Sequence, residues 1–177
     1  MTRIIFIVIV AISASVQLHA QNLDRLDKDN GFRKFIIGSS FDDYKKELKP
    51  LKQVNPAFNS YRYAGADSTL RNIADVHPFE IHLLFDTTNT LVLVASYILI
   101  VNDGKSFEKK SQQTFEDVKK WFIDLYGSNY SAVQTEFSEG LQWETEKLNL
   151  LVKMWSDQKM AWRRIDVTIK KKEILKN

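Results

Sequence analysis

The chain has 177 residues, a formal net charge of +3 and no cysteine, and it is long enough for one domain or two small ones with a buried core. The near-neutral charge argues against a nucleic-acid reader, because such proteins normally carry a large basic excess or a recognised motif. The lack of cysteine excludes disulfides, so packing must supply the stability.

The first twenty residues have the layout of a secretory signal peptide. Arg3 precedes nine apolar residues at 4–12, and the segment then ends in Leu18-His19-Ala20. We therefore expect cleavage after Ala20. The apolar run is too short for a membrane span, which needs about 20 residues. These features predict export to the periplasm or the extracellular space, with no membrane insertion after cleavage.

Residues 21–34 form a polar leader, and a first α+β half is expected over 35–104. Ser40 and Asp43 have the spacing of a capping box and predict a short helix over 40–51, which ends near Pro50. Strands are predicted at 35–37, 60–64, 79–85 and 91–101, with a further short strand at 70–73. In the strand at 79–85, Phe79, Ile81, Leu83 and Phe85 are expected on one face, and Glu80, His82 and Asp86 on the other.

A second α+β half is expected over 105–177. The clearest element is a helix at about 112–126, with Thr114 as its cap and Gly127 as its stop. Its apolar face consists of Phe115, Val118, Phe122 and Leu125. Strands are predicted at 132–137, 141–144, 148–155 and 161–170, with a turn at 138–140.

The expected fold class is α+β, with two halves that each consist of a helix followed by an antiparallel meander. The helices are expected on one face of the sheet, because short connections between consecutive strands favour hairpins. Segments 40–51 and 114–125 share five of twelve residues. A tandem duplication explains this identity, but so does the general similarity of capped amphipathic helices. The two halves can also form one continuous domain.

The order of elements resembles a known module. Gly38-Ser39-Ser40 and Gln112-Gln113-Thr114 are similar helix starts, Leu125-Tyr126-Gly127 is a helix end, and a strand bearing Trp143 follows. This order resembles the helix-plus-antiparallel-sheet module of the beta-lactamase-inhibitory-protein and BamE-like group, over residues 35–174. The resemblance implies a secreted or periplasmic binding protein that uses the open face of its sheet. It carries over no functional residue, and the disulfides of the inhibitory protein cannot form here.

One segment concentrates metal-ligand types. His77, Glu80 and His82 supply three potential zinc ligands, and Glu80 and His82 share a strand face. The alternative interpretation is a polar strand face with two solvated or hydrogen-bonded imidazoles. No nucleophile motif or phosphate loop occurs, and no cofactor is expected. A small secreted hydrolase or metal-binding protein centred on these residues is therefore the alternative function.

The main functional hypothesis is an exported, non-enzymatic binding or inhibitor-like protein with a protein or cell-envelope partner. Trp, Tyr and Arg dominate binding energy where they are exposed together, although aromatic residues are also common in cores. The candidate binding residues are Tyr61, Tyr63, Trp143, Trp155, Trp162 and Arg164. Trp162 and Arg164 are the best pair, because Ile165 on the opposite face of their strand already supplies the core.

Overall fold

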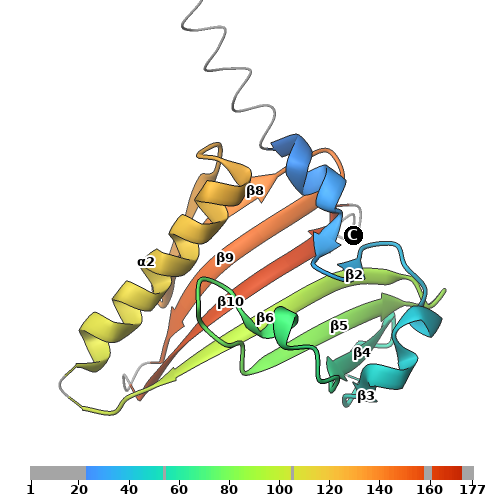
Figure 1. Ribbon diagram of the computed structural model, residues 1–177, viewed down its shortest axis with the longest axis horizontal. Helices are drawn as coiled ribbons and strands as arrows, with labels where there is room; N and C mark the ends of the chain where they lie inside the picture. The colour runs from blue at the N-terminus through green and yellow to red at the C-terminus, as the bar shows by residue number, and fades with distance from the viewer. Residues whose placement is uncertain (1–22, 54, 105, 158–160, 173–177) are drawn as a thin grey trace, which may run out of the picture.

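The computed structural model describes residues 23–53, 55–104, 106–157 and 161–172. Its main feature is one eight-stranded antiparallel sheet with the order β3-β4-β5-β6-β10-β9-β8-β7 (Figure 1). The strands are β3 (Leu48–Pro50), β4 (Phe58–Tyr63), β5 (Glu80–Asp86), β6 (Leu91–Val101), β7 (Ser131–Thr135), β8 (Ser138–Glu144), β9 (Leu148–Ser156) and β10 (Trp162–Lys171). A separate two-stranded ribbon pairs β1 (Gly31–Phe32) with β2 (Phe35–Ile36).

The long strands form where apolar and polar residues alternate along the chain, as the sequence predicts. In β9 and β10 every second residue is buried, which is the pattern of a sheet with one covered face. β6 and β10 pair at the centre of the sheet, with Ile98 opposite Ile165 and Val94 opposite Ile169. This pairing joins the part of the sheet before residue 104 to the part after it.

All described helices lie on one side of the sheet, which we call the covered face (Figure 1). They are a helix at residues 23–29, α2 (Phe107–Tyr126) and three short 3₁₀ helices, η1 (Phe41–Asp43), η2 (Lys45–Glu47) and η3 (Ser68–Arg71). The largest fully buried side chains between these elements and the sheet include Trp143, Phe35, Phe85, Phe115, Phe122, Leu26, Leu70 and Ile73. One hydrophobic core therefore fills the covered face.

The predicted arrangement of two helix-plus-meander halves is wrong, although the broader α+β class is right. One continuous sheet replaces the two halves, and no α-helix forms over 40–51. The predicted capping box of Ser40 and Asp43 is present, but it starts only the 3₁₀ turns η1 and η2. Leu48 then leaves helical geometry to pair with Tyr63 in the sheet. Strand pairing by 48–50 therefore limits this segment to short turns.

The helix α2 begins earlier than predicted. Ser106 is its cap residue, and Thr114 lies inside the helix, where its hydroxyl donates to the Lys110 carbonyl at 2.8 Å. The predicted stop is confirmed, because Gly127 has φ of +79° and its N–H bonds to the Ile123 carbonyl at 2.7 Å. Most of the predicted apolar face is also confirmed, since Phe115, Val118 and Phe122 are buried, whereas Leu125 is only partly buried against the core.

Three other segments differ from prediction. Residues 23–29, expected in a polar leader, form a helix whose Leu26 is fully buried. In the expected strand at 70–73, residues 70 and 71 belong to the 3₁₀ helix η3, and Ile73 forms only an isolated bridge with Val76. The expected turn at 138–140 lies inside β8, whose hairpin with β7 turns at Glu136 and Phe137. The predicted signal peptide at 1–20 lies outside the described residues.

Candidate functional site

The second side of the sheet, which no described helix covers, is called the open face (Figure 1). Strand register sets its side chains in rows across β5, β6, β10 and β9. One row contains Glu80, Tyr97 and Asp166, and the next contains Leu99, Arg164 and Trp155. Side chains from four strands therefore meet on this face.

Tyr97 lies at the centre of the open face. The His82 ring contacts it edge-on at 4.9 Å between centroids, and the Arg164 guanidinium carbon lies 5.1 Å from its ring centroid. Burial raises the pKa of the Tyr97 hydroxyl above its ordinary value, and the nearby Asp166 carboxylate adds to this effect. The phenol is therefore neutral at physiological pH, and its ring is a packing surface for the His82 ring and the Arg164 guanidinium.

Two ion-pair groups flank Tyr97. Arg164 donates to both oxygens of Asp166, with Nε to Oδ1 at 2.6 Å and Nη2 to Oδ2 at 2.9 Å. Burial nevertheless raises the pKa of the Asp166 carboxyl above its ordinary value. Oε2 of Glu80 lies 2.7 Å from Nε2 of His82, and Oε1 of Glu80 accepts a hydrogen bond from Nη1 of Arg62 at 3.1 Å. Although burial alone would raise the Glu80 pKa, these two partners lower it.

A hollow of about 630 Å³ lies beside these groups on the open face. Its volume falls in the range of small-molecule and side-chain pockets, about 300–1,000 Å³. The hollow is lined by Phe79, Glu80, His82, Tyr97, Leu99, Val101, Ala161, Trp162 and Arg164. Three of these side chains are large, apolar and well exposed: Phe79 at 69%, Leu99 at 40% and Val101 at 61%. The hollow is therefore an apolar surface beside a row of paired charges.

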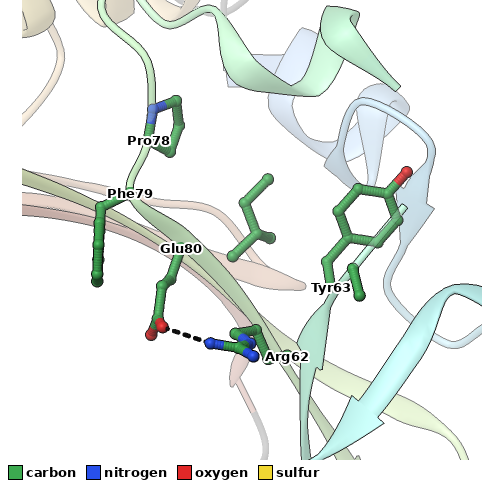
Figure 2. Close-up of a pocket in the computed structure, with 7 residues that line it drawn as sticks. Arg62, Tyr63, Pro78, Phe79 and Glu80 are labelled. Atoms are coloured by element: carbon green, nitrogen blue, oxygen red, sulfur yellow. Dashed lines mark hydrogen bonds and ion pairs between the residues drawn. The ribbon is translucent and has the colours of Figure 1, made fainter. Parts of the chain in front are cut away.

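A second, smaller hollow of about 280 Å³ lies where β4 ends and β5 begins (Figure 2). In Figure 2, Phe79 and Glu80 point to the same side of the sheet, whereas Tyr63 points to the other side. The sequence predicted Phe79 on the core side with Ile81. That prediction is wrong because β5 begins at Glu80, so Phe79 precedes the strand alternation. Phe79 and Glu80 line both hollows.

The six predicted binding residues divide between the two faces. Trp155, Trp162 and Arg164 lie on the open face. Trp143 is fully buried in the core, and its indole N–H donates to the Gly127 carbonyl at 2.8 Å. The two tyrosines also belong to the covered side: Tyr61 packs on Phe41 and Phe85, and Tyr63 packs on Phe35.

The alternative metal set is only partly assembled. Glu80 and His82 contact one another directly, but no group of three His, Cys, Asp or Glu side chains among the described residues could hold a metal ion. His77 precedes β5 and does not line the large hollow. The contacts with His82 and Arg62 favour the ionised Glu80 carboxylate, because they lower its pKa.

Several residues of the site were not singled out from sequence. Tyr97, Leu99 and Val101 belong to β6, whose side chains are apolar on both faces. Such a run predicts a strand buried on both sides, and it gives no sign of which face lies open. Ser96 and Tyr97 interrupt the aliphatic run on opposite faces, so the sequence of β6 alone does not indicate which face lies open.

Comparisons with protein-family models, with curated proteins and with solved structures found no match for this chain. The resemblance to the beta-lactamase-inhibitory-protein and BamE-like group therefore stays a prediction. Among the described residues, no helix combines the length and apolar composition needed to cross a membrane.

Proposed function

We propose that this chain is an exported, non-enzymatic binding protein whose open face engages a protein or cell-envelope partner. One observation carries the proposal. Phe79, Leu99 and Val101 are large, apolar and exposed, and all three line one hollow that no described helix covers. Exposed apolar side chains gathered around a concavity are typical of binding sites.

The charges of the open face indicate what kind of partner it suits. Arg164 is paired with Asp166, and Arg62 with Glu80. A charged partner group would compete with these existing ion pairs and lose its own hydration. An apolar or aromatic side chain that enters the hollow instead removes exposed hydrocarbon from water. We therefore expect a protein partner that inserts an apolar side chain, with an affinity that changes little with salt concentration.

The test combines partner capture with residue-level mapping. The purified mature chain is incubated with the native envelope fraction, and the captured protein is purified and added back in a titration. Hydroxyl-radical footprinting then measures the protection of Phe79, Leu99 and Trp162. We expect strong protection of these side chains and no protection of Ile36, which is exposed on β2 outside the hollow.

A matched pair of variants checks the site. Leu99→Asp introduces a charge into the hollow from β6. Thr168→Asp introduces the same charge on β10, on the same open face of the sheet but outside the hollow. We expect the first variant to lose binding by about tenfold or more and the second to bind nearly as the native chain does. Equal binding by both variants would contradict the proposal. Stoichiometric zinc in the purified protein would instead support the metal-binding alternative.

The proposed export has its own test. If the signal peptide is cleaved after Ala20, the protein recovered from the periplasm or medium begins at Gln21. Intact-mass measurement of the exported protein checks this. An intact leader on the recovered protein, or recovery only from the cytoplasm, would contradict it.

A further inference from the structure

The two edges of the sheet are built differently. At one edge, β3 has only three residues, which include Lys49 and end at Pro50. A short edge strand with a lysine and a proline resists further strand pairing, because proline lacks a backbone donor and the charge must stay hydrated. This edge of the sheet is therefore protected.

At the other edge, β7 has none of these protective features. Its sequence, Ser131-Ala-Val-Gln-Thr135, contains no charge, proline or glycine. Four of its five side chains are exposed and Val133 is half-buried. Among the described strands β7 pairs only with β8. An uncharged edge strand of this kind offers its outer backbone N–H and C=O groups to another extended segment.

Exposed aromatic residues lie at both ends of β7. The described residues include six exposed large apolar side chains, and three of them line the hollow on the open face. Two of the remaining three are Tyr130, immediately before β7, and Phe137, in the turn immediately after it. The apolar surface left outside the hollow is thus concentrated at this edge.

We propose that β7 pairs antiparallel with β7 of a second copy of this chain and forms a closed dimer. A twofold axis at Val133 would place Ala132 opposite Gln134 and Ser131 opposite Thr135 of the second copy. No like charges then oppose one another, and the Ser–Thr pairs can hydrogen-bond. The strand ends also bring Tyr130 near the Phe137 end of the second copy.

The protected edge explains why such pairing would stop at two copies. A twofold interface uses the same strand on both copies, so it leaves no second β7 available. Further growth would require pairing at β3, where Lys49 and Pro50 oppose it. The geometry therefore favours a discrete dimer over a fibre. An extended segment of a different protein is the competing occupant of β7.

The lack of cysteine makes a selective cross-linking test possible. Val133→Cys places one thiol at the proposed axis, where directly opposed antiparallel residues lie about 4.5–5.5 Å apart between Cα atoms. This separation suits a disulfide. Lys49→Cys on the protected edge is the matched control. We expect mild oxidation to link the Val133→Cys chains about tenfold faster or more, because paired strands hold the two thiols at high effective concentration.

Sedimentation equilibrium of the native chain gives the second readout. We expect the average mass to rise toward that of a dimer with concentration, and Val133→Lys to remain a monomer with an unchanged circular dichroism spectrum. A native chain that stays monomeric, together with equal linking rates for the two cysteine variants, would overturn the proposal. Persistent dimerisation of Val133→Lys would also overturn it. Leu99→Asp should dimerise normally, which separates this test from that of the open face.

Discussion

Arg163 and Arg164 are adjacent on β10 but face opposite sides of the sheet. Arg163 is buried on the covered face, where it donates to Ser111 at 2.9 Å and to Glu108 at 2.5 Å, both on α2. Arg164 lies on the open face and pairs with Asp166 of its own strand. The first arginine therefore ties α2 to the sheet, whereas the second belongs to the candidate binding surface.

This difference predicts unequal effects on stability. Arg163→Ala should lower the free energy of unfolding by about 2–3 kcal/mol, because it removes two hydrogen bonds from a charged group and the packing of its buried stem. Arg164→Ala should cost less, since the Arg164 side chain is 40% exposed and its ion pair lies within one strand, so that it ties no second element to the sheet. Urea unfolding of both variants measures this. A larger loss for Arg164→Ala would reassign that residue to the core.

The helix at residues 23–29 should contribute directly to stability. Leu26 is fully buried in the core, so Leu26→Ala should cost about 2–5 kcal/mol. Leu23, one turn earlier, is only partly buried against the core, and Leu23→Ala should cost clearly less. Chemical unfolding of both variants measures this difference. If both variants lose equally little free energy of unfolding, the helix at residues 23–29 is only loosely held, as its polar composition suggested.

Two buried serines should respond to alanine in opposite directions. Ser96 is 1% exposed on the covered face, and its hydroxyl has no hydrogen-bond partner among the described residues. Ser96→Ala should therefore stabilise the protein by about 1 kcal/mol, because burying an unpaired hydroxyl is costly. Ser138 is also buried, but it hydrogen-bonds Thr135.

Ser138→Ala should consequently destabilise the protein by about 1 kcal/mol. Thermal unfolding of the two variants beside the native chain gives the comparison. A loss of stability in Ser96→Ala would indicate that its hydroxyl is hydrogen-bonded after all.

The two carboxylates on either side of Tyr97 should give opposite pH dependences. Hydrogen bonds from His82 and Arg62 lower the Glu80 pKa below its ordinary 4.5. The stability that ionised Glu80 contributes is therefore present above pH 4.5 and is lost as the pH falls through its lowered pKa. Burial raises the Asp166 pKa above its ordinary 3.8, so its contribution grows as the pH falls through the raised pKa.

Urea unfolding across acidic pH tests these signs. For each variant, its free energy of unfolding is subtracted from that of the native chain at every pH. The difference for Glu80→Gln should shrink as the pH falls, whereas the difference for Asp166→Asn should grow. Subtracting each variant removes the contributions of other acids. Slopes of the same sign for both differences would show that Tyr97 does not separate two distinct environments.

Much of the sheet could be predicted from sequence. The strand at 91–101 has the predicted bounds, and β9 and β10 match their predictions within a residue. The apolar face of α2 and its stop at Gly127 were also predictable. These features depend on the alternation or helical spacing of neighbouring side chains, and a short stretch of sequence contains that information.

Part of the candidate site was predictable for the same reason. Alternation in β10 separated Trp162 and Arg164 from Ile165, and alternation in β5 joined Glu80 to His82. Trp143 looked similar to Trp162 in sequence, yet it is fully buried. Composition cannot distinguish two tryptophans whose strands present them to opposite sides of a sheet.

The sequence by itself therefore determined the long strands, the long helix and the alternation of side chains within β9 and β10. Only the tertiary structure decided that 40–51 forms short turns, that one sheet replaces two halves, and that Tyr97 lies between Glu80 and Asp166. These outcomes depend on long-range pairing, such as Leu48 with Tyr63 and Ile98 with Ile165. Local periodicity sets the face of each residue, whereas the packing of distant segments selects the face that stays exposed.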